Sequence, residues 1–216
     1  SSEDAGEIAN LASKCANGSV AANAVSMDDA QKGALSLAIV KISSITNLSL
    51  ASSEDATEIA NLASKCADGS VAVNAASMDG DQKGALSLAI AKVSAITNLS
   101  LASSEDATEI ANLASKCANG SVAVNAASMD GDQKGALSLA IAKISSITGL
   151  ALASSEDATE IANLLGKATG ATAVATGMNA AQLNALSAGY LSIAANGITG
   201  ALTVDSNITS VANLMA

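Results

Sequence analysis

The sequence predicts an α/β protein, a repeat solenoid of helix–strand units with a parallel sheet. Within each repeat, helical spacing of apolar residues alternates with the every-second-residue spacing of strands. Four repeats follow from the letters SSED, which return at a constant step of 51 residues and mark repeats over 1–51, 52–102, 103–153 and a divergent 154–216.

The first half of each repeat predicts one helix and one short strand. In the third repeat, residues 103–117 place Ile110 and Ala114 at helical spacing, with acids at the start and a lysine near the end, as the helix dipole favours. Beyond the following glycine, SVAVNA alternates Val122 and Val124 with smaller residues, which is typical of a strand.

The second half predicts a longer helix and another strand. Residues 128–144 carry Gln133, Leu137 and Ile141 along one stripe, and the segment 146–152 alternates apolar residues. Strands separated by helices of this length favour right-handed crossovers and a parallel sheet.

The fourth repeat departs from this pattern. It has Ala168 where the other repeats have cysteine, and a shortened strand around 172–175. We interpret its tail as a last strand within 198–204 and a closing helix over 205–216.

Composition excludes several classes of partner. The formal charge is -10, there is no Arg, His, Phe, Trp or Pro, and Tyr190 is the single aromatic residue. Nucleic-acid binding needs clustered cations and often aromatic platforms, so we expect no nucleic-acid partner. The most apolar run, at 34–40, lies between lysines and is too short for a membrane span, so we expect no membrane insertion.

Two acidic motifs resemble chemical sites. The loop MDGDQKG at 129–135 has spacings similar to a calcium loop, but Lys134 takes a ligand position and no glutamate closes the loop. The acids of SSEDATE recur without a nearby histidine or arginine. Both patterns favour helix N-termini, and we expect no enzyme activity, cofactor, metal or small-molecule substrate.

The predicted strands leave a face of small, uncharged residues. Its members in the second repeat are Ile96, Asn98 and Ser100. Such a face can approach another sheet, or it can be a concave surface in water. The first strand, near Ser19–Ala24, is predicted to be an unpaired edge, and head-to-tail pairing at such an edge gives rings or filaments.

Three cysteines recur at the repeat step, Cys15, Cys66 and Cys117. Equivalent residues two turns apart lie roughly 10 Å apart by strand spacing, whereas a disulfide needs Cα atoms within about 7 Å. The cysteines should therefore not pair with one another. Each is a small core residue, replaceable by the alanine at 168, or a candidate for an intermolecular disulfide. The third alternative is a metal ligand, against which stands the lack of a nearby histidine or second cysteine.

Sequons offer glycosylation sites if the chain is extracellular. Asn17 and Asn119 lie in predicted helix-to-strand turns and are the most accessible candidates. Because Leu-Ala precedes SSED in later repeats, Ser1 is compatible with signal cleavage after small residues and equally with a sequence boundary.

Near-identical Ala/Ser/Asn-rich repeats, missing aromatics, acidic balance and periodic cysteines together resemble the tubular sheath proteins of filamentous methanogenic archaea. Those proteins form stacked hoops of β-rich subunits held by β-pairing and disulfides. The resemblance implies an extracellular structural subunit at the cell surface that assembles with copies of itself. It also implies that the three cysteines are cross-link candidates and that strand edges are polymer contacts.

Two other classes compete with this interpretation. The segment ITNLSLA at 96–102 resembles a leucine-rich repeat, which implies a secreted recognition or adhesion module, although its concave face lacks aromatic and arginine anchors. An ice-binding solenoid would carry threonines aligned in rows on a flat face, and only isolated ones such as Thr97 and Thr148 occur.

Overall fold

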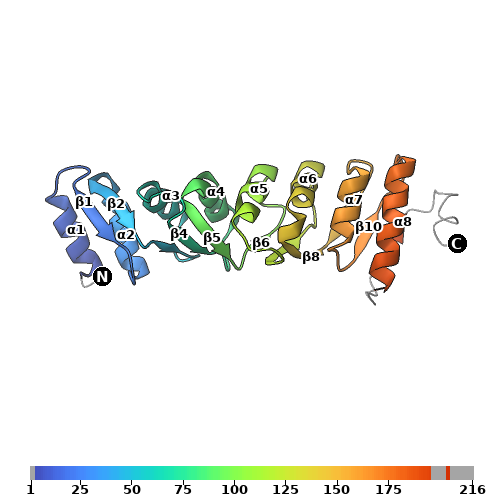
Figure 1. Cartoon of the computed structure of the whole chain (residues 1–216). Coiled ribbons are helices and arrows are strands. Elements are labelled where there is room, and N and C mark those ends of the chain that lie inside the picture. The colour runs from blue at the N-terminus through green and yellow to red at the C-terminus, as the bar shows by residue number, and fades with distance from the viewer. Residues whose placement is uncertain (1–2, 196–202, 205–216) are drawn as a thin grey trace. The chain divides into compact units, whose positions relative to one another are not determined.

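The computed structural model describes residues 3–195 and 203–204. It confirms an α/β chain in which helices alternate with short strands, and every strand pair in the described residues is parallel (Figure 1). The chain packs as two compact units. Unit 1 comprises Ser1–Leu99 with Lys116–Ala118, and unit 2 comprises Ser100–Ser115 with Asn119–Ala216.

Unit 1 holds the first repeat and most of the second. Its strands form two small sheets, β1-β2 and β3-β4-β5. The elements are α1 (Ala5–Ser13), β1 (Val20–Asn23), α2 (Asp29–Leu37), the 3-10 helix η1 (Ile39–Lys41), β2 (Ile42–Thr46), β3 (Ser49–Leu50), α3 (Ala56–Ser64), β4 (Val71–Asn74), α4 (Gly80–Leu88), η2 (Ile90–Lys92) and β5 (Val93–Thr97).

Unit 2 continues the alternation of helices and short strands, and its last described helix is longer than its others. Its sheets are β6-β7-β8 and β9-β10-β11. The strand predicted within 198–204 is confirmed as β11, and the predicted closing helix lies outside the described residues. The elements are β6 (Ser100–Leu101), α5 (Ala107–Ser115), β7 (Val122–Asn125), α6 (Gly131–Leu139), η3 (Ile141–Lys143), β8 (Ile144–Thr148), β9 (Leu150–Leu152), α7 (Ala158–Leu165), β10 (Ala171–Ala173), α8 (Ala180–Ala195) and β11 (Thr203–Val204).

Capping boxes set where the helices begin. The Asp55 carboxylate accepts a hydrogen bond from the Glu58 N–H at 2.8 Å, and the Glu58 carboxylate accepts one from the Asp55 N–H at 3.1 Å. The second helix of the repeat uses Asp79 and Gln82 in the same way. The helix therefore starts after the aspartate, and it is shorter than the spacing of its apolar residues predicts.

A left-handed residue bends the chain between two successive strands that belong to different sheets. Asn47 joins β2 to β3 with a φ of 56°, and at the same point of later repeats stand Asn98 at 54° and Gly149 at 63°. Asparagine and glycine tolerate this region best, which explains their exchange in the sequence. The Asn47 amide also donates to the Asn23 side chain at 2.9 Å, so β1 and the bend are tied together.

The apolar core of the described residues lies between helices and strands and consists of Ala, Val, Ile and Leu with a few Met and Cys side chains. Ile96, expected on the outer face of its strand, is buried in this core and is 2 % exposed. The reason is a shift of register between Val71 and Ala72, which places Val93 and Ile96 inward although they are three residues apart. The rest of the prediction holds, because Asn98 and Ser100 are exposed.

Candidate functional site

Two of the three cysteines are core residues. Cys66 and Cys117 are 5 % and 4 % exposed, and each follows its helix and bridges to a strand, Cys66 to Ile45 and Cys117 to Ile96. The Cys66 thiol donates to the Leu62 carbonyl at 3.4 Å. Burial raises the pKa of the Cys66 thiol to about 11, and Lys92 only partly opposes this. Their burial argues against the predicted intermolecular disulfides at these two positions.

Cys15 differs because its surroundings differ. It is partly exposed, and its thiol donates to the Leu11 carbonyl at 3.3 Å, the same local bond that Cys66 makes. The structure joins none of the three cysteines to another by a disulfide. Cys15 is the one cysteine of the three whose position leaves it accessible to a neighbouring molecule.

The two predicted glycosylation sites lie on the surface. Asn17 and Asn119 are exposed and lie in helix-to-strand turns, each followed by a glycine with positive φ, 66° at Gly18 and 68° at Gly120. An exposed turn of this kind leaves the asparagine side chain open to an enzyme.

The loop with spacings similar to a calcium loop is a helix start. The Asp130 carboxylate accepts from the Gln133 N–H at 2.9 Å, which confirms the capping interpretation. The Gln133 amide also donates to the Glu105 carbonyl at 2.6 Å, so this side chain holds two segments of its repeat. Within the described residues, no cluster of three or more His, Cys, Asp or Glu could hold a metal ion.

A buried ion pair links one repeat to the next, and the local sequence patterns did not predict it. Lys32 of the first repeat donates to the Glu54 carboxylate at 2.9 Å, and Glu54 is 0 % exposed. The same carboxylate accepts from the Ala51 N–H at 2.7 Å and from the Ser53 hydroxyl at 2.9 Å. Unit 2 repeats the pair between Lys134 and Glu156 at 3.0 Å.

We call this contact the repeat joint. In unit 1 it brings α2 against α3 and β3 against β4. The helices approach closely at Gly33, where an added Cβ would lie 2.9 Å from a Glu58 oxygen. The Asn61 amide donates to the Ser36 hydroxyl at 3.0 Å across the same contact. Burial, an ion pair and a hydrogen bond therefore all hold one repeat on the next.

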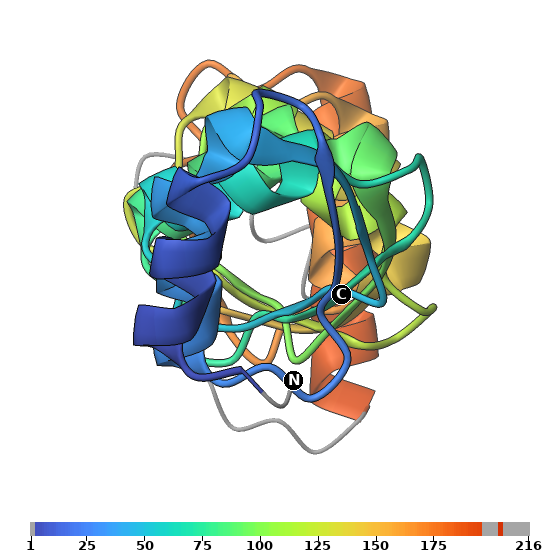
Figure 2. The ribbon, with the colours of Figure 1, turned by 90° about the vertical axis from the view of Figure 1, so that its left-hand side faces the viewer.

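In the described residues, the equivalent surface of the first repeat is more exposed than that of the second. Leu11 is 57 % exposed, whereas Leu62, its equivalent in the second repeat, is 0 % exposed. Figure 2 looks onto this end of unit 1, with α1 and β1 in front. We call this surface the N-terminal end face. Its members are exposed or half-buried, whereas their equivalents in the second repeat are buried. They are Glu3, Ile8, Leu11, Cys15, Val20 and Met27.

The backbone of β1 is open on the same side. At the repeat joint the Ala72 N–H donates to the Leu48 carbonyl at 3.2 Å. The matching group in β1 is the Ala21 N–H, and no acceptor for it occurs in the part of the chain that the structure describes. The prediction that the first strand has an unpaired edge is confirmed for residues 3–195 and 203–204, since β1 pairs with β2 alone.

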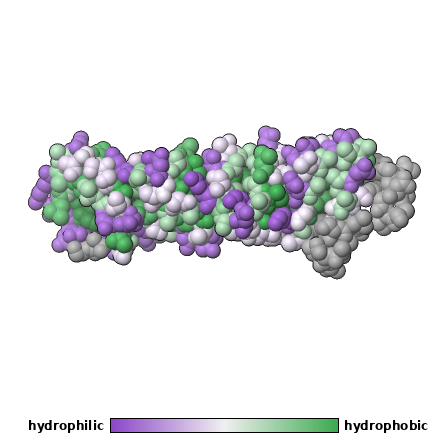
Figure 3. All heavy atoms as spheres, in the orientation of Figure 1, coloured by the Kyte–Doolittle hydropathy of each residue, from purple (hydrophilic) through white to green (hydrophobic). Residues whose placement is uncertain are grey.

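A second apolar feature recurs at the end of the second helix of each early repeat. Leu37, Leu88 and Leu139 close α2, α4 and α6 and are 90 %, 92 % and 90 % exposed. Figure 3 shows hydrophobic side chains, in green, at the surface among hydrophilic ones. A shallow groove of about 230 Å³ lies beside Leu88, lined by alanines such as Ala60 and Ala85.

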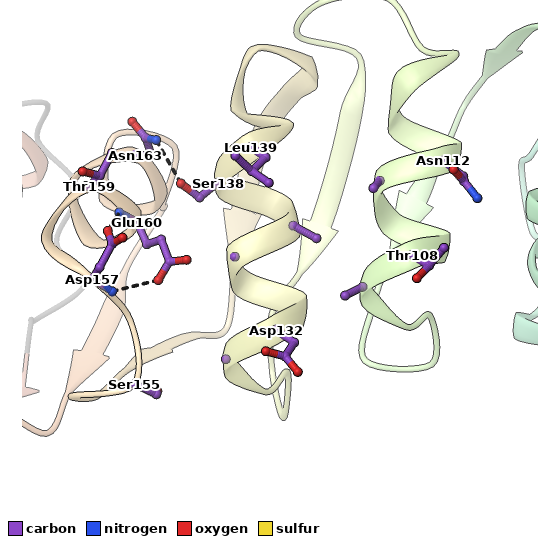
Figure 4. Close-up of a pocket in the computed structure, with 15 residues that line it drawn as sticks. Thr108, Asn112, Asp132, Ser138, Leu139, Ser155, Asp157, Thr159, Glu160 and Asn163 are labelled. Carbon is purple, nitrogen blue, oxygen red and sulfur yellow. Dashed lines mark hydrogen bonds between the residues drawn. The ribbon is translucent and has the colours of Figure 1, made fainter.

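A wider groove crosses the helices of unit 2. It has a volume of about 880 Å³ and lies over α5, α6 and α7 (Figure 4). Thr108, Asn112 and Asp132 give it polar walls, and Leu139 adds an apolar one. On its α7 side the Asn163 amide donates to the Ser138 hydroxyl at 2.9 Å, so these two side chains hold the helices together.

No family model, no curated protein and no solved structure matches this chain. Among the described residues, no helix is both long enough and apolar enough to cross a membrane.

Proposed function

We propose that the chain is a structural subunit of an extracellular sheath or filament, in which copies of the chain associate through surfaces that recur along it. In this proposal the four sequence repeats form one continuous solenoid. The proposed assembly is of the kind that the archaeal sheath proteins named above form.

The exposed leucines carry this proposal. Leu37, Leu88 and Leu139 recur at one position of the repeat and are each about nine-tenths exposed. Burying a leucine side chain contributes about 1.5–3 kcal/mol, so three such contacts supply roughly 4–9 kcal/mol before the cost of association. One contact is too weak to hold two molecules, whereas several in register hold an array.

The strand face adds a second surface for assembly. Ser44, Thr46 and Ala95 are exposed, small and uncharged. A face of this kind lets another sheet approach closely, as the sheath interpretation requires.

Sedimentation velocity over a range of concentrations tests the proposal. The unaltered chain is expected to form species that grow with concentration, and the triple variant Leu37→Lys, Leu88→Lys, Leu139→Lys is expected to stay monomeric. A matched variant, Ser44→Lys with Ala95→Lys, places new charges on the strand face. If the triple leucine variant still assembles but the Ser44→Lys, Ala95→Lys variant does not, the contact between molecules lies on the strand face and not at the leucines.

Cys15 is the cysteine that we retain as a cross-link candidate. Non-reducing electrophoresis of material from the native source should then give single chains and disulfide-linked pairs, because one accessible thiol joins only two chains. A ladder of larger reducible species would mean that Cys66 and Cys117 also react.

Extracellular location is part of the same proposal and has its own test. Chains from the native source are expected to carry glycans at Asn17 and Asn119, because both are exposed sequons. Mass spectrometry of the purified protein before and after chemical deglycosylation measures this directly, and unmodified asparagines at both positions would remove this support.

The wider groove of unit 2 favours a second candidate, a secreted recognition or adhesion module. Its polar walls and volume of about 880 Å³ suit an extended polar ligand such as a glycan. Binding of the chain to a glycan array, lost on Asn112→Ala with Asp132→Ala, would favour this candidate over assembly.

A further inference from the structure

Two exposed turns carry an asparagine directly before a glycine. Asn17 and Gly18 lie in the turn from α1 to β1, and Asn119 and Gly120 hold the same places between α5 and β7. Both asparagines are exposed, and a Cβ added at either glycine would have nothing within 4 Å. A third such pair, at 196–197, lies outside the described residues. The glycine therefore brings no side chain that would hinder chemistry at the asparagine amide.

An asparagine in this setting loses its amide through attack by its own backbone, which makes it a thermolabile residue. The glycine nitrogen bonds to the side-chain carbonyl carbon, the carbon–nitrogen bond of the side-chain amide breaks, and ammonia leaves a cyclic imide. Water then opens the ring. If the new bond breaks, the product is aspartate; if the original peptide bond breaks, the product is isoaspartate. Either route consumes one water, releases one ammonia and replaces a neutral amide with a carboxylate.

The second repeat already carries the aspartate product at this turn. Asp68 stands where the first and third repeats have Asn17 and Asn119. The backbone around it is the same, because Gly69 has a φ of 67° and the glycines of the other two turns have 66° and 68°. An aspartate therefore fits this turn without rearrangement of the chain.

The carboxylate at this position has a cationic partner. The Lys92 ammonium group donates to Asp68 at 2.8 Å, and this hydrogen bond lowers the pKa of Asp68. Lys41 holds the place of Lys92 in the first repeat, since each is the last residue of a 3-10 helix. The Asp68 side chain is 74 % exposed, so the pair contributes little to stability. Its effect is to place a negative charge beside a lysine at the surface.

A backbone hydrogen bond restrains the attacking nitrogen. The Gly18 N–H donates to the Val40 carbonyl at 3.0 Å, and the Gly120 N–H donates to the Ala142 carbonyl at 2.9 Å. Ring closure requires this bond to break, so the turn must open first. An exposed turn opens at a lower free energy than the core. The reaction is therefore slower in the folded chain than in the unfolded chain, but it is not prevented.

We propose that Asn17 and Asn119 are sites of deamidation, which proceeds when the turn opens. The aspartate formed at position 17 then pairs with Lys41, as its counterpart does in the second repeat. Deamidation also removes the sequon, because only asparagine accepts the glycan, so the two modifications exclude each other at each site. The reaction needs neither assembly nor an extracellular location, and it thus stands apart from the proposed function.

Peptide mass spectrometry of the full chain, produced without glycosylation and incubated in mildly alkaline buffer, tests the proposal. The conversion of each asparagine is followed over time in the folded chain and in the chain unfolded by urea. Asn47 and Asn98 are the reference sites, because both are exposed but precede leucine. The matched control is Asn17→Gln with Asn119→Gln, which keeps the amide on a longer side chain that closes a ring less readily.

In the folded chain, Asn17 and Asn119 are expected to convert about tenfold or more faster than the reference sites, and about tenfold or more slower than in urea. The glutamine control is expected to lose the conversion at both positions. Intact amides at 17 and 119 in the folded chain, over a time in which the unfolded chain converts, would overturn the proposal. Conversion no faster than at the reference sites would overturn it as well.

Carbodiimide cross-linking of the variant Asn17→Asp tests the ion pair separately, because this reagent joins a carboxylate directly to a neighbouring amine. The bond between Asp68 and Lys92 is the internal standard, since these groups already lie 2.8 Å apart. A link between position 17 and Lys41 is expected at a similar yield. A chain that forms the standard link but not the new one would overturn the pairing.

Discussion

Removal of the Glu54 carboxylate should destabilise unit 1 more than any surface substitution. Glu54 is 0 % exposed and accepts three bonds, from Lys32, Ser53 and the Ala51 backbone. In Glu54→Ala the Lys32 ammonium stays buried, with a side chain 10 % exposed, and its other carboxylate contact is Asp29 at 3.8 Å, which is largely in solvent. Breaking a buried pair in this way costs about 3–5 kcal/mol.

Urea unfolding followed by circular dichroism measures this cost. The variant Glu54→Gln keeps the shape and part of the hydrogen bonding, so its cost should be smaller, about 1.5–3 kcal/mol. Asp68→Asn is the matched control, because Asp68 pairs with Lys92 on the surface and the third repeat already has Asn119 there. A midpoint for Glu54→Ala that matches this control would refute the role of the buried pair.

Two further predictions concern single residues. Because burial raises the Cys66 pKa from its ordinary 9.0 to about 11, its contribution to stability is present below pH 9 and is lost as pH rises through about 11. The chain should therefore lose more stability between these values than its Cys66→Ala variant, as thermal unfolding at each pH will measure; parallel loss in both would contradict the shift. Gly69→Ala should cost about 1 kcal/mol, because Gly69 has a φ of 67° and open space around it, so the penalty is conformational only. An unchanged urea midpoint for this variant would show that the turn tolerates alanine.

The sequence predicted what local chemistry decides. The helix start at the MDGDQKG loop, the strand around Val122 and the open edge near Val20 all follow from patterns a few residues long, and the structure bears them out. The alternation of helices and parallel strands could be read in the same way, because the repeat presents each pattern several times.

Features that depend on a neighbouring repeat were missed. Glu54 was interpreted with the other acids of SSED as part of a helix start, although the helix is capped by Asp55 and Glu54 is buried against Lys32. A signal was present, since a lysine and this glutamate recur 22 residues apart three times in the sequence. The prediction placed Ile96 on the wrong face of its strand. Strict alternation of side chains along a strand assumes a regular register, and here the register between the paired strands shifts.

The cysteines illustrate the same limit. Helical spacing places Cys117 on the stripe of Ile110, but the helix ends at Ser115 and the cysteine instead bridges to Ile96. Its burial depends on that strand, which no local pattern reveals. Cys15 lies in the same local sequence as Cys117 but is more exposed, because different residues surround it in the fold.

Electron microscopy of the purified chain, raised stepwise in concentration, tests the central claim that its recurring exposed surfaces hold copies together. The account predicts ordered sheets or filaments whose subunit spacing is constant and which disappear in the triple leucine-to-lysine variant. Separate particles of one chain at every concentration would contradict it.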